Sequence, residues 1–271
     1  MTGREREARE FLALTDQIAR KTGFGMSSYK PSCLRRRVAV RMRACGAEHF
    51  TAYARVLEAD PAEYGRLVDT LTINVTRLFR NPDTWRAVAR DVLPTLWART
   101  DRRLDCWVAG CSSGEEAWTL AALWQHQADS LGARLSRVRV RATDIDRTSL
   151  EAAERATWTA SALDDVPTAL RARAFHGADA VTVASALRTI VTFEKRDLLQ
   201  EPPPAGPLHL ITCRNVIIYF DRESQDALFE RMHAALVPGG FLVLGKVETM
   251  LGAARDRFEC VDARQRIFRP R

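Results

Sequence analysis

The chain has 271 residues, of which 46% are hydrophobic and 28% are charged, and its formal net charge is +7. This length fits one large domain or two smaller ones, and the composition is that of a soluble globular protein. No apolar run approaches the roughly 20 residues that a membrane helix needs, and the charged residues 1–10 do not resemble a signal peptide. The six cysteines are scattered without a C-x-x-C pair, which argues against structural zinc. We therefore expect a cytoplasmic protein with reduced cysteines, no membrane insertion and no metal.

Residues 1–72 are predicted to be helical throughout. Apolar residues follow a helical period around Phe11 and Ile18, and glycines at 23 and 25 end that first helix. Ser27 or Ser28 is placed to cap a second helix that runs to about Ala44. Two further helices are expected over residues 50–57 and 61–71, the latter opened by Pro61.

The second of these helices is strongly basic. Between Lys30 and Arg43 there are six basic residues and no acidic one, and an apolar stripe through Leu34, Val38 and Met42 is bordered by cations. Such a surface is either a solvated helix face or a docking face for acid-rich protein or nucleic acid. The arginines on its flanks are Arg36, Arg37, Arg41 and Arg43.

A strand, a glycine turn and a helix follow the helical region. Residues 104–109 read as a buried parallel strand, residues 110–114 as a tight glycine-containing loop, and Glu115 and Glu116 open a helix. This order forms the front half of a nucleotide-binding βαβ unit. Because the spacing is not G-x-G-x-x-G, no lysine follows, and two carboxylates would repel a pyrophosphate, the loop favours an adenosine compound without phosphates. An ordinary strand-to-helix turn is the alternative.

The α/β rhythm continues to the end of the chain with one interruption. A second strand over 138–143 ends at Asp144, where an acidic side chain grips a ribose diol, while Asp146 better fits a helix N-cap. Residues 156–196 are predicted as a small antiparallel insertion, with a short helix at 167–175 and β-rich runs at 180–183 and 189–193. Then come a strand at 208–213, a helix at 222–236, a turn at 238–240, and strands at 241–245 and 265–269.

Polar residues gather where these strands end. Ligands of open parallel sheets bind at the carboxyl ends of the strands. The glycine loop, Asp144, Asp197 and residues 214–216 all follow strands in this way. The sequence therefore predicts one site that is shared by several strand ends.

Five strings occur in order along the chain: N-x-T-x-x-F-R at 74–80, C-S-S-G-E-E at 111–116, A-T-D-I-D at 142–146, C-R-N-V-x-I-Y-F-D at 213–221, and L-x-P-G-G at 236–240. Together they resemble the CheR-type chemotaxis receptor methyltransferases, which are protein-glutamate O-methyltransferases. The first and fourth strings are highly specific, whereas the glycine loop and P-G-G are common among methyltransferases. The resemblance covers nearly the whole chain.

The resemblance implies an α/β fold: a doubly wound, Rossmann-like S-adenosylmethionine methyltransferase domain (73–271) with its antiparallel β insertion at about 156–196, preceded by an all-helical receptor-docking domain (1–72). The implied reaction esterifies glutamate side chains on the cytoplasmic helices of chemoreceptors and leaves S-adenosylhomocysteine. The residues that would line the cofactor are Asn74, Thr76, Arg80, Gly110, Glu116, Asp144, Asp197, Leu198, Asn215 and Val216. The chain departs from the family at Asp197, Leu78 and Lys246.

The implied chemistry needs no general base, because a glutamate carboxylate with a reference pKa of about 4.3 is already a nucleophile at neutral pH. Positioning and the removal of water then supply the catalysis. Arg80 is expected to anchor a carboxylate of the cofactor or the substrate. Tyr219 is expected beside the transferring methyl group, with its hydroxyl orienting the substrate oxygen; the alternative is an aromatic residue packed in the core.

The expected partners follow from the same resemblance. Acid-rich receptor helices would dock on Arg36, Arg37, Arg41 and Arg43. The loop at 176–179 is too short for the pentapeptide tether of some family members. We expect a monomer that does not bind nucleic acid, since base-modifying motifs are not evident. The alternatives are a related methyltransferase acting on another protein or a small acid, and a non-catalytic signalling module that binds the cofactor.

Overall fold

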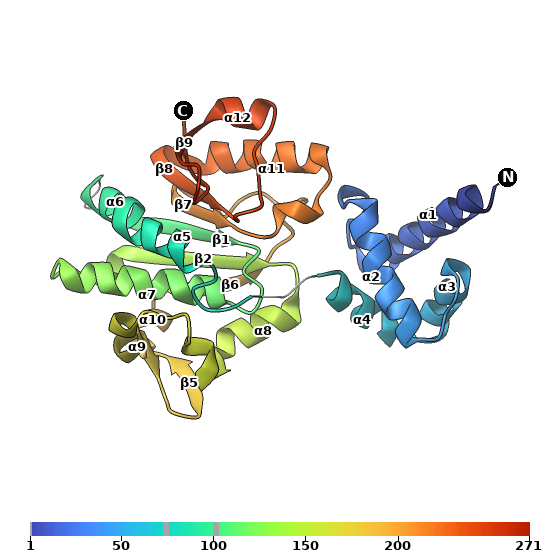
Figure 1. Ribbon diagram of the computed structural model, residues 1–271, viewed down its shortest axis with the longest axis horizontal. Helices are drawn as coiled ribbons and strands as arrows, with labels where there is room; N and C mark the ends of the chain where they lie inside the picture. The colour runs from blue at the N-terminus through green and yellow to red at the C-terminus, as the bar shows by residue number, and fades with distance from the viewer. Residues whose placement is uncertain (1, 73–75, 100–102) are drawn as a thin grey trace. The chain divides into compact units, whose positions relative to one another are not determined.

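The computed structural model describes residues 2–72, 76–99 and 103–271 (Figure 1). Its contacts divide the chain into two compact units. The first unit comprises residues 1–73 together with 219–225, and the second comprises residues 74–218 and 226–271. The predicted cofactor residue Asn74 lies outside the described residues.

The first unit is helical. Its helices are α1 (Gly3–Thr22), η1 (Met26–Ser28), α2 (Pro31–Ala44), α3 (Phe50–Ala59) and α4 (Ala62–Leu71). Thr2 and Glu5 form a capping box at the start of α1, and Gly23 ends that helix in the left-handed conformation. The predicted apolar stripe of α2 is buried at Leu34, Val38 and Met42. Amphipathic packing thus forms the core of this unit, as the sequence indicated.

The expected serine cap of α2 is wrong. The helix begins with Pro31 in its first turn, the N-cap is Lys30, and no side chain caps it. Proline suits this position because its missing N–H would have had no partner inside the helix. Ser28 instead accepts a backbone hydrogen bond from Asp221, at 2.9 Å, beside an antiparallel bridge between Tyr29 and Phe220. The 219–225 segment therefore joins the first unit by backbone pairing.

The second unit is built on a seven-stranded sheet. The strands lie in the order β6 (Val191–Lys195), β2 (Val138–Asp144), β1 (Leu104–Ala109), β7 (Leu208–Cys213), β8 (Leu236–Leu244), β10 (Ile267–Pro270) and β9 (Phe258–Asp262). From β6 to β8 the neighbours are parallel, whereas β10 is antiparallel to both β8 and β9. Counting only the strands of this sheet, the order is 3-2-1-4-5-7-6, a doubly wound arrangement that reverses between β1 and β7.

Helices and short helical turns precede β1 and connect the later strands. They are α5 (Pro82–Ala87), η2 (Val88–Val92), α6 (Leu93–Arg99), α7 (Glu115–Ser130), η3 (Leu135–Arg137), α8 (Arg147–Arg155), η4 (Ala160–Leu163), α9 (Thr168–Ala174), α10 (Ser185–Arg188), η5 (Ile217–Tyr219), α11 (Arg222–Ala235) and α12 (Ala253–Arg257). Helix α7 packs against β2 and β6, and its buried Trp118 and Trp124 fill the core between helix and sheet. The long apolar face of α7 thereby places its first turn at the carboxyl end of β1.

The antiparallel insertion exists, but its composition differs from the prediction. Its sheet has the order β3 (Thr157–Thr159), β5 (Ala180–Val183) and β4 (Phe175–His176). The run at 189–193, expected in this insertion, is instead strand β6 of the main sheet, parallel to β2 with Phe193 opposite Ala142. Val191 is buried, and the Phe193 ring lies 5.5 Å from the ring of Trp118 on α7. This packing against α7 explains why the strand joins the main sheet rather than the insertion.

Two features near the C-terminus also differ. The expected turn at 238–240 lies within β8, which passes through Gly239 with φ +74° and shifts its register against β7. Strand β9 and helix α12 were not predicted, because an edge strand with mostly exposed residues has no apolar alternation to reveal it.

Candidate functional site at the carboxyl ends of the sheet

The glycine loop after β1 is fastened to the ends of two other strands. The backbone N–H groups of Gly110 and Cys111 both donate to the carbonyl of Thr143, at 2.8 and 2.9 Å. Gly110 has φ +76°, and a Cβ built there would lie 2.5 Å from a methyl carbon of Val216. Only glycine fits this approach of the β1 and β7 loops, so two predicted cofactor residues are in direct contact.

Asp144 supports the loop from the end of β2. One carboxylate oxygen accepts the N–H of Ser112 at 2.7 Å and the other accepts that of Asp146 at 3.0 Å. A third backbone contact comes from Ile145, and a carboxylate with about four acceptor sites still has capacity for a ligand hydroxyl. Burial raises the pKa of Asp144, so the carboxylate is held at an electrostatic cost. Asp146 caps α8 by accepting from Thr148, which confirms its predicted structural role.

Arg214 was placed at a strand end by the sequence but was missed as a residue that holds the site together. Its side chain is only 1% exposed, one terminal nitrogen donates to Glu116 at 2.8 Å, and the other donates to the carbonyl of Arg80 at 2.8 Å and to Asn81 at 3.0 Å. The guanidinium also stands 4.9 Å from the centre of the Trp85 ring. Arg214 therefore joins the start of α7 to the turn that carries Arg80. Its position between Cys213 and Asn215 was the available signal, but nothing in the string indicated these contacts.

Glu248 is the second missed residue. Its buried carboxylate accepts backbone N–H groups from Asn215 (3.0 Å), Val216 (2.9 Å), Ile217 (2.9 Å) and Gly245 (2.6 Å). Burial raises its pKa, while the four donors favour the ionised form. The clamp holds Asn215 at φ +63°, a strained region for a residue with a side chain. The available signal was an acidic residue three positions after the glycine that follows β8.

The remaining predicted cofactor residues are distributed over the same unit. Thr76 and Arg80 are half-buried, and Leu198 is buried. The Asp197 carboxylate accepts the N–H of Leu199 at 2.8 Å, which closes a turn after β6. Lys246 donates to the side chain of Gln265 and to the carbonyl of Arg264, next to β10.

The residues that were predicted to contact the substrate, Tyr219 and the arginines of α2, belong to the first unit. Tyr219 accepts the backbone N–H of Lys30 at 2.9 Å through its carbonyl, so the structure fixes its backbone within that unit. The placement of its ring beside the cofactor residues stays a prediction.

The four arginines of α2 do not share one environment. Arg41 forms a bidentate ion pair with buried Glu63, at 2.8 and 2.7 Å, and Tyr53 donates to the same carboxylate at 2.9 Å. Arg37 donates to the carbonyl of Thr70 at 3.0 Å. Arg36 and Arg43 are exposed. Arg41 therefore has a structural partner, whereas Arg36 and Arg43 are the exposed cations of this helix.

The site chemistry suits a ligand that carries hydroxyl groups, such as a ribose diol. Asp144 offers unused acceptor sites for a diol, and the Ser112 hydroxyl is buried without a hydrogen-bond partner among the described residues. Gly110 lets the β1 loop pack directly against Val216 beside these acceptors. No cluster of three or more possible metal ligands occurs in residues 2–72, 76–99 and 103–271, and no helix in those ranges is long and apolar enough to span a membrane.

The fold and the acidic, glycine-lined strand ends define a Rossmann-like protein that binds a nucleoside cofactor. The family model "CheR methyltransferase, SAM binding domain" matches residues 74–267, and "CheR methyltransferase, all-alpha domain" matches residues 9–72. The chain therefore belongs to the CheR methyltransferase family, and its cofactor is S-adenosylmethionine.

Three relatives illustrate the range of the family. A putative methyltransferase, Cher3, of Pseudomonas putida is 32% identical and covers 99% of both chains. Chemotaxis protein methyltransferase 2 of Pseudomonas aeruginosa is 31% identical over 90% of this chain and 88% of its own. An uncharacterised 104.1 kDa protein of Rhodobacter capsulatus is 34% identical over 96% of this chain, which spans only 27% of that protein.

Proposed function

We propose that this protein transfers a methyl group from S-adenosylmethionine to glutamate carboxylates on the cytoplasmic helices of chemoreceptors, in the cytoplasm. The observation that carries the proposal is the site at the ends of β1, β2 and β7, where Gly110 meets Val216 and the same glycine loop binds the Asp144 carboxylate through Ser112. The names of the relatives, chemotaxis protein methyltransferases among them, support the substrate class.

The cofactor supplies an electrophilic methyl group on a sulfonium. Asp144 would hold the ribose hydroxyls with its unused lone pairs, and Ser112 would offer a further hydrogen bond. Glu116 is fixed by Arg214, so its second oxygen can face the ligand without the side chain rotating. Arg80 would bind a carboxylate through its planar fork. The remaining proposed cofactor contacts are Asn74, Thr76, Asp197, Leu198 and Asn215.

Glutamate needs positioning and desolvation rather than a base, because its carboxylate is ionised at neutral pH. Tyr219 would orient the accepting oxygen with its hydroxyl. Residues 1–72 would dock the receptor and residues 73–271 would carry the reaction. The exposed Arg36 and Arg43 would attract acid-rich helices over a distance of about a Debye length, 8–10 Å at physiological salt.

A pentapeptide tether is not expected. In the insertion, β4 ends at His176 and β5 begins at Ala180, so three residues connect the two paired strands. A calorimetric titration with a receptor C-terminal pentapeptide should show no binding. Micromolar affinity would contradict this interpretation.

The test of the proposed function is tritiated methyl transfer from S-adenosylmethionine to a purified receptor signalling fragment. Wild type should give base-labile label, which is diagnostic of carboxyl methyl esters. Arg80→Ala should lose about tenfold or more of this activity, since a charged hydrogen-bonded contact is worth roughly 1.5–3 kcal/mol. Its backbone carbonyl, which Arg214 uses, survives the substitution.

Arg77→Ala is the matched control, because that side chain is 61% exposed and pairs with Asp165 at the surface. Its activity should equal that of wild type. If wild type binds S-adenosylhomocysteine but labels no receptor fragment, the substrate assignment fails while the family assignment stands.

A further inference from the structure

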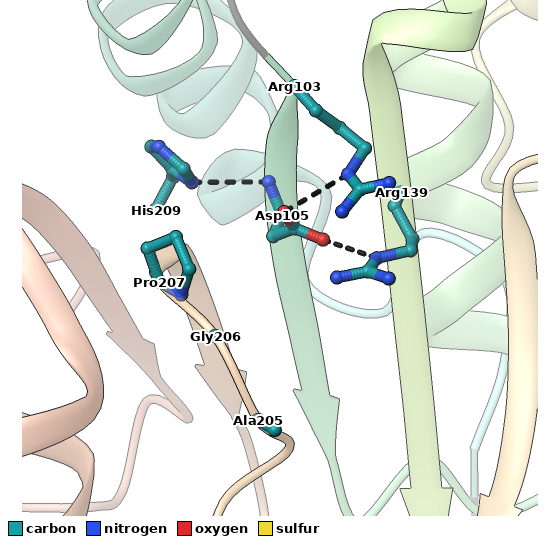
Figure 2. A pocket seen from close by; sticks show the side chains of 7 residues that line it. All are labelled: Arg103, Asp105, Arg139, Ala205, Gly206, Pro207 and His209. Atoms are coloured by element: carbon teal, nitrogen blue, oxygen red, sulfur yellow. Dashed lines mark hydrogen bonds and ion pairs between the residues drawn. The ribbon is translucent and has the colours of Figure 1, made fainter.

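A charged cavity lies at the end of the sheet opposite the cofactor site, where β1, β2 and β7 begin (Figure 2). Its volume is about 530 Å³. Since β1 has six residues and a strand rises about 3.3 Å per residue, the cavity lies roughly 20 Å along the strands from the glycine loop. It is therefore separate from the cofactor site. It is lined by Arg103, Asp105, Arg139, Ala205, Gly206, Pro207 and His209.

A buried carboxylate orients two guanidinium groups in this cavity. Asp105 is 3% exposed, and its two oxygens bind the Nε atoms of Arg103, at 3.3 Å, and of Arg139 on the neighbouring strand. Both contacts use Nε, which leaves the terminal nitrogens of Arg103 and Arg139 available on side chains that are 55% and 34% exposed. Figure 2 shows the two guanidinium groups next to one another, on the same side of β1.

A third guanidinium stands beside this pair. Arg141, two residues further along β2, donates to the carbonyl of Ala205 at 2.6 Å. Its Nε and second terminal nitrogen are buried without a hydrogen-bond partner among the described residues. Burial lowers the pKa of Arg141, and the charges of Arg139 and Arg103 lower it further. Two of these three cations share the Asp105 carboxylate, and the charge of Glu194 also acts on Arg141, so cations outnumber carboxylates in this cluster.

We propose that this cavity binds a small phosphate-bearing ligand, whose phosphate group bridges the terminal nitrogens of Arg103 and Arg139. Planar guanidinium forks bind phosphate oxygens bidentately, and a dianion would offset the mutual repulsion of the three cations. His209 accepts the backbone N–H of Asp105 through Nδ1 at 3.2 Å, so its neutral ring carries the proton on Nε2 as a further donor. The 205–207 segment forms the opposite wall, against which the rest of the ligand would pack.

The test is calorimetric titration of the full chain with inorganic phosphate and, separately, with AMP at low ionic strength. Wild type should bind one equivalent, and Arg103→Gln and Arg139→Gln should each weaken binding tenfold or more. Arg134→Gln removes the same charge from an exposed position outside the cavity and should bind as wild type does. Tighter binding of AMP than of phosphate would identify a phosphomonoester as the ligand, and equal binding would identify free phosphate.

The Asp105→Asn variant tests whether phosphate binding depends on guanidinium groups oriented by Asp105 or only on the net positive charge of the cavity. The substitution adds one unit of net positive charge, but a single amide oxygen cannot hold both Nε atoms. Weaker phosphate binding supports the oriented site, whereas tighter binding would overturn it. If this variant does not fold, the two arginine variants decide. Binding should be unchanged when the cofactor site is saturated with S-adenosylhomocysteine. Absence of binding to both probes, or equal binding by the arginine variants and wild type, would refute the proposal.

Discussion

Replacing Arg41 with alanine should destabilise the helical unit rather than merely weaken receptor docking. Arg41 is the main cause that lowers the pKa of Glu63 from 4.5 to about 2. Since one pKa unit corresponds to about 1.4 kcal/mol, the folded state stabilises the ionised carboxylate by roughly 3 kcal/mol. Removing Arg41 leaves a carboxylate that is 1% exposed with Tyr53, the Cys45 thiol and the half-exposed Arg66. We expect a loss of about 3 kcal/mol, within the range for broken buried ion pairs.

The same contact should make the stability of this unit depend on pH. The folded-state pKa of Glu63 lies below its unfolded value, so the contribution is complete above about pH 5. It is lost progressively as the pH falls towards 2. Arg41→Ala should abolish most of this dependence between pH 5 and pH 3.

Urea unfolding with two probes measures the effect. All six tryptophans, at positions 85, 97, 107, 118, 124 and 158, lie in the second unit, so their fluorescence reports on that unit, whereas far-UV circular dichroism also detects the helices of the first. With an m-value of about 1–2 kcal/mol per molar urea, a loss of about 3 kcal/mol should lower the urea midpoint of the first unit, followed by circular dichroism, by roughly 1.5 M or more. The fluorescence transition should stay in place. Arg43→Ala, at an exposed position on the same helix, is the control. A first-unit midpoint for Arg41→Ala equal to that of Arg43→Ala would refute the reasoning.

Three further predictions concern the cofactor and the receptor. Gly110→Ala should weaken S-adenosylhomocysteine binding at least tenfold in calorimetry, because its Cβ collides with Val216 at a positive φ, and Val216→Ala in the same chain should restore part of the loss. Glu248→Gln should also weaken that binding, since one amide oxygen cannot accept four N–H groups; unchanged affinity would exclude the clamp from cofactor binding. Charge reversal at Arg36 and Arg43 should raise the receptor KM in the methylation assay while S-adenosylhomocysteine affinity stays constant, and a loss of cofactor binding would contradict a docking role.

The local order of the site could be read from the sequence. The strand at 104–109, its glycine loop and the helix from Glu115 occur as predicted, because an apolar run, a glycine break and an acidic first turn are all determined by neighbouring residues. The strand at 208–213 has the expected limits for the same reason. Strand direction follows from chain order in a doubly wound sheet, so the sequence also placed Asp144 and Val216 at one edge.

Contacts between distant residues were decided only by the tertiary structure. The pairing of β6 with β2 rather than with the insertion depends on Phe193 packing against Trp118, which no local pattern encodes. Arg41 meets Glu63 22 positions away, and Arg214 meets Glu116 98 positions away. The neighbouring sequence of a charged residue does not reveal whether its side chain is solvated or forms a buried ion pair. Its role is therefore determined by what the fold brings against it, and in this protein that difference separates Arg41, in a buried ion pair, from the exposed Arg36 and Arg43.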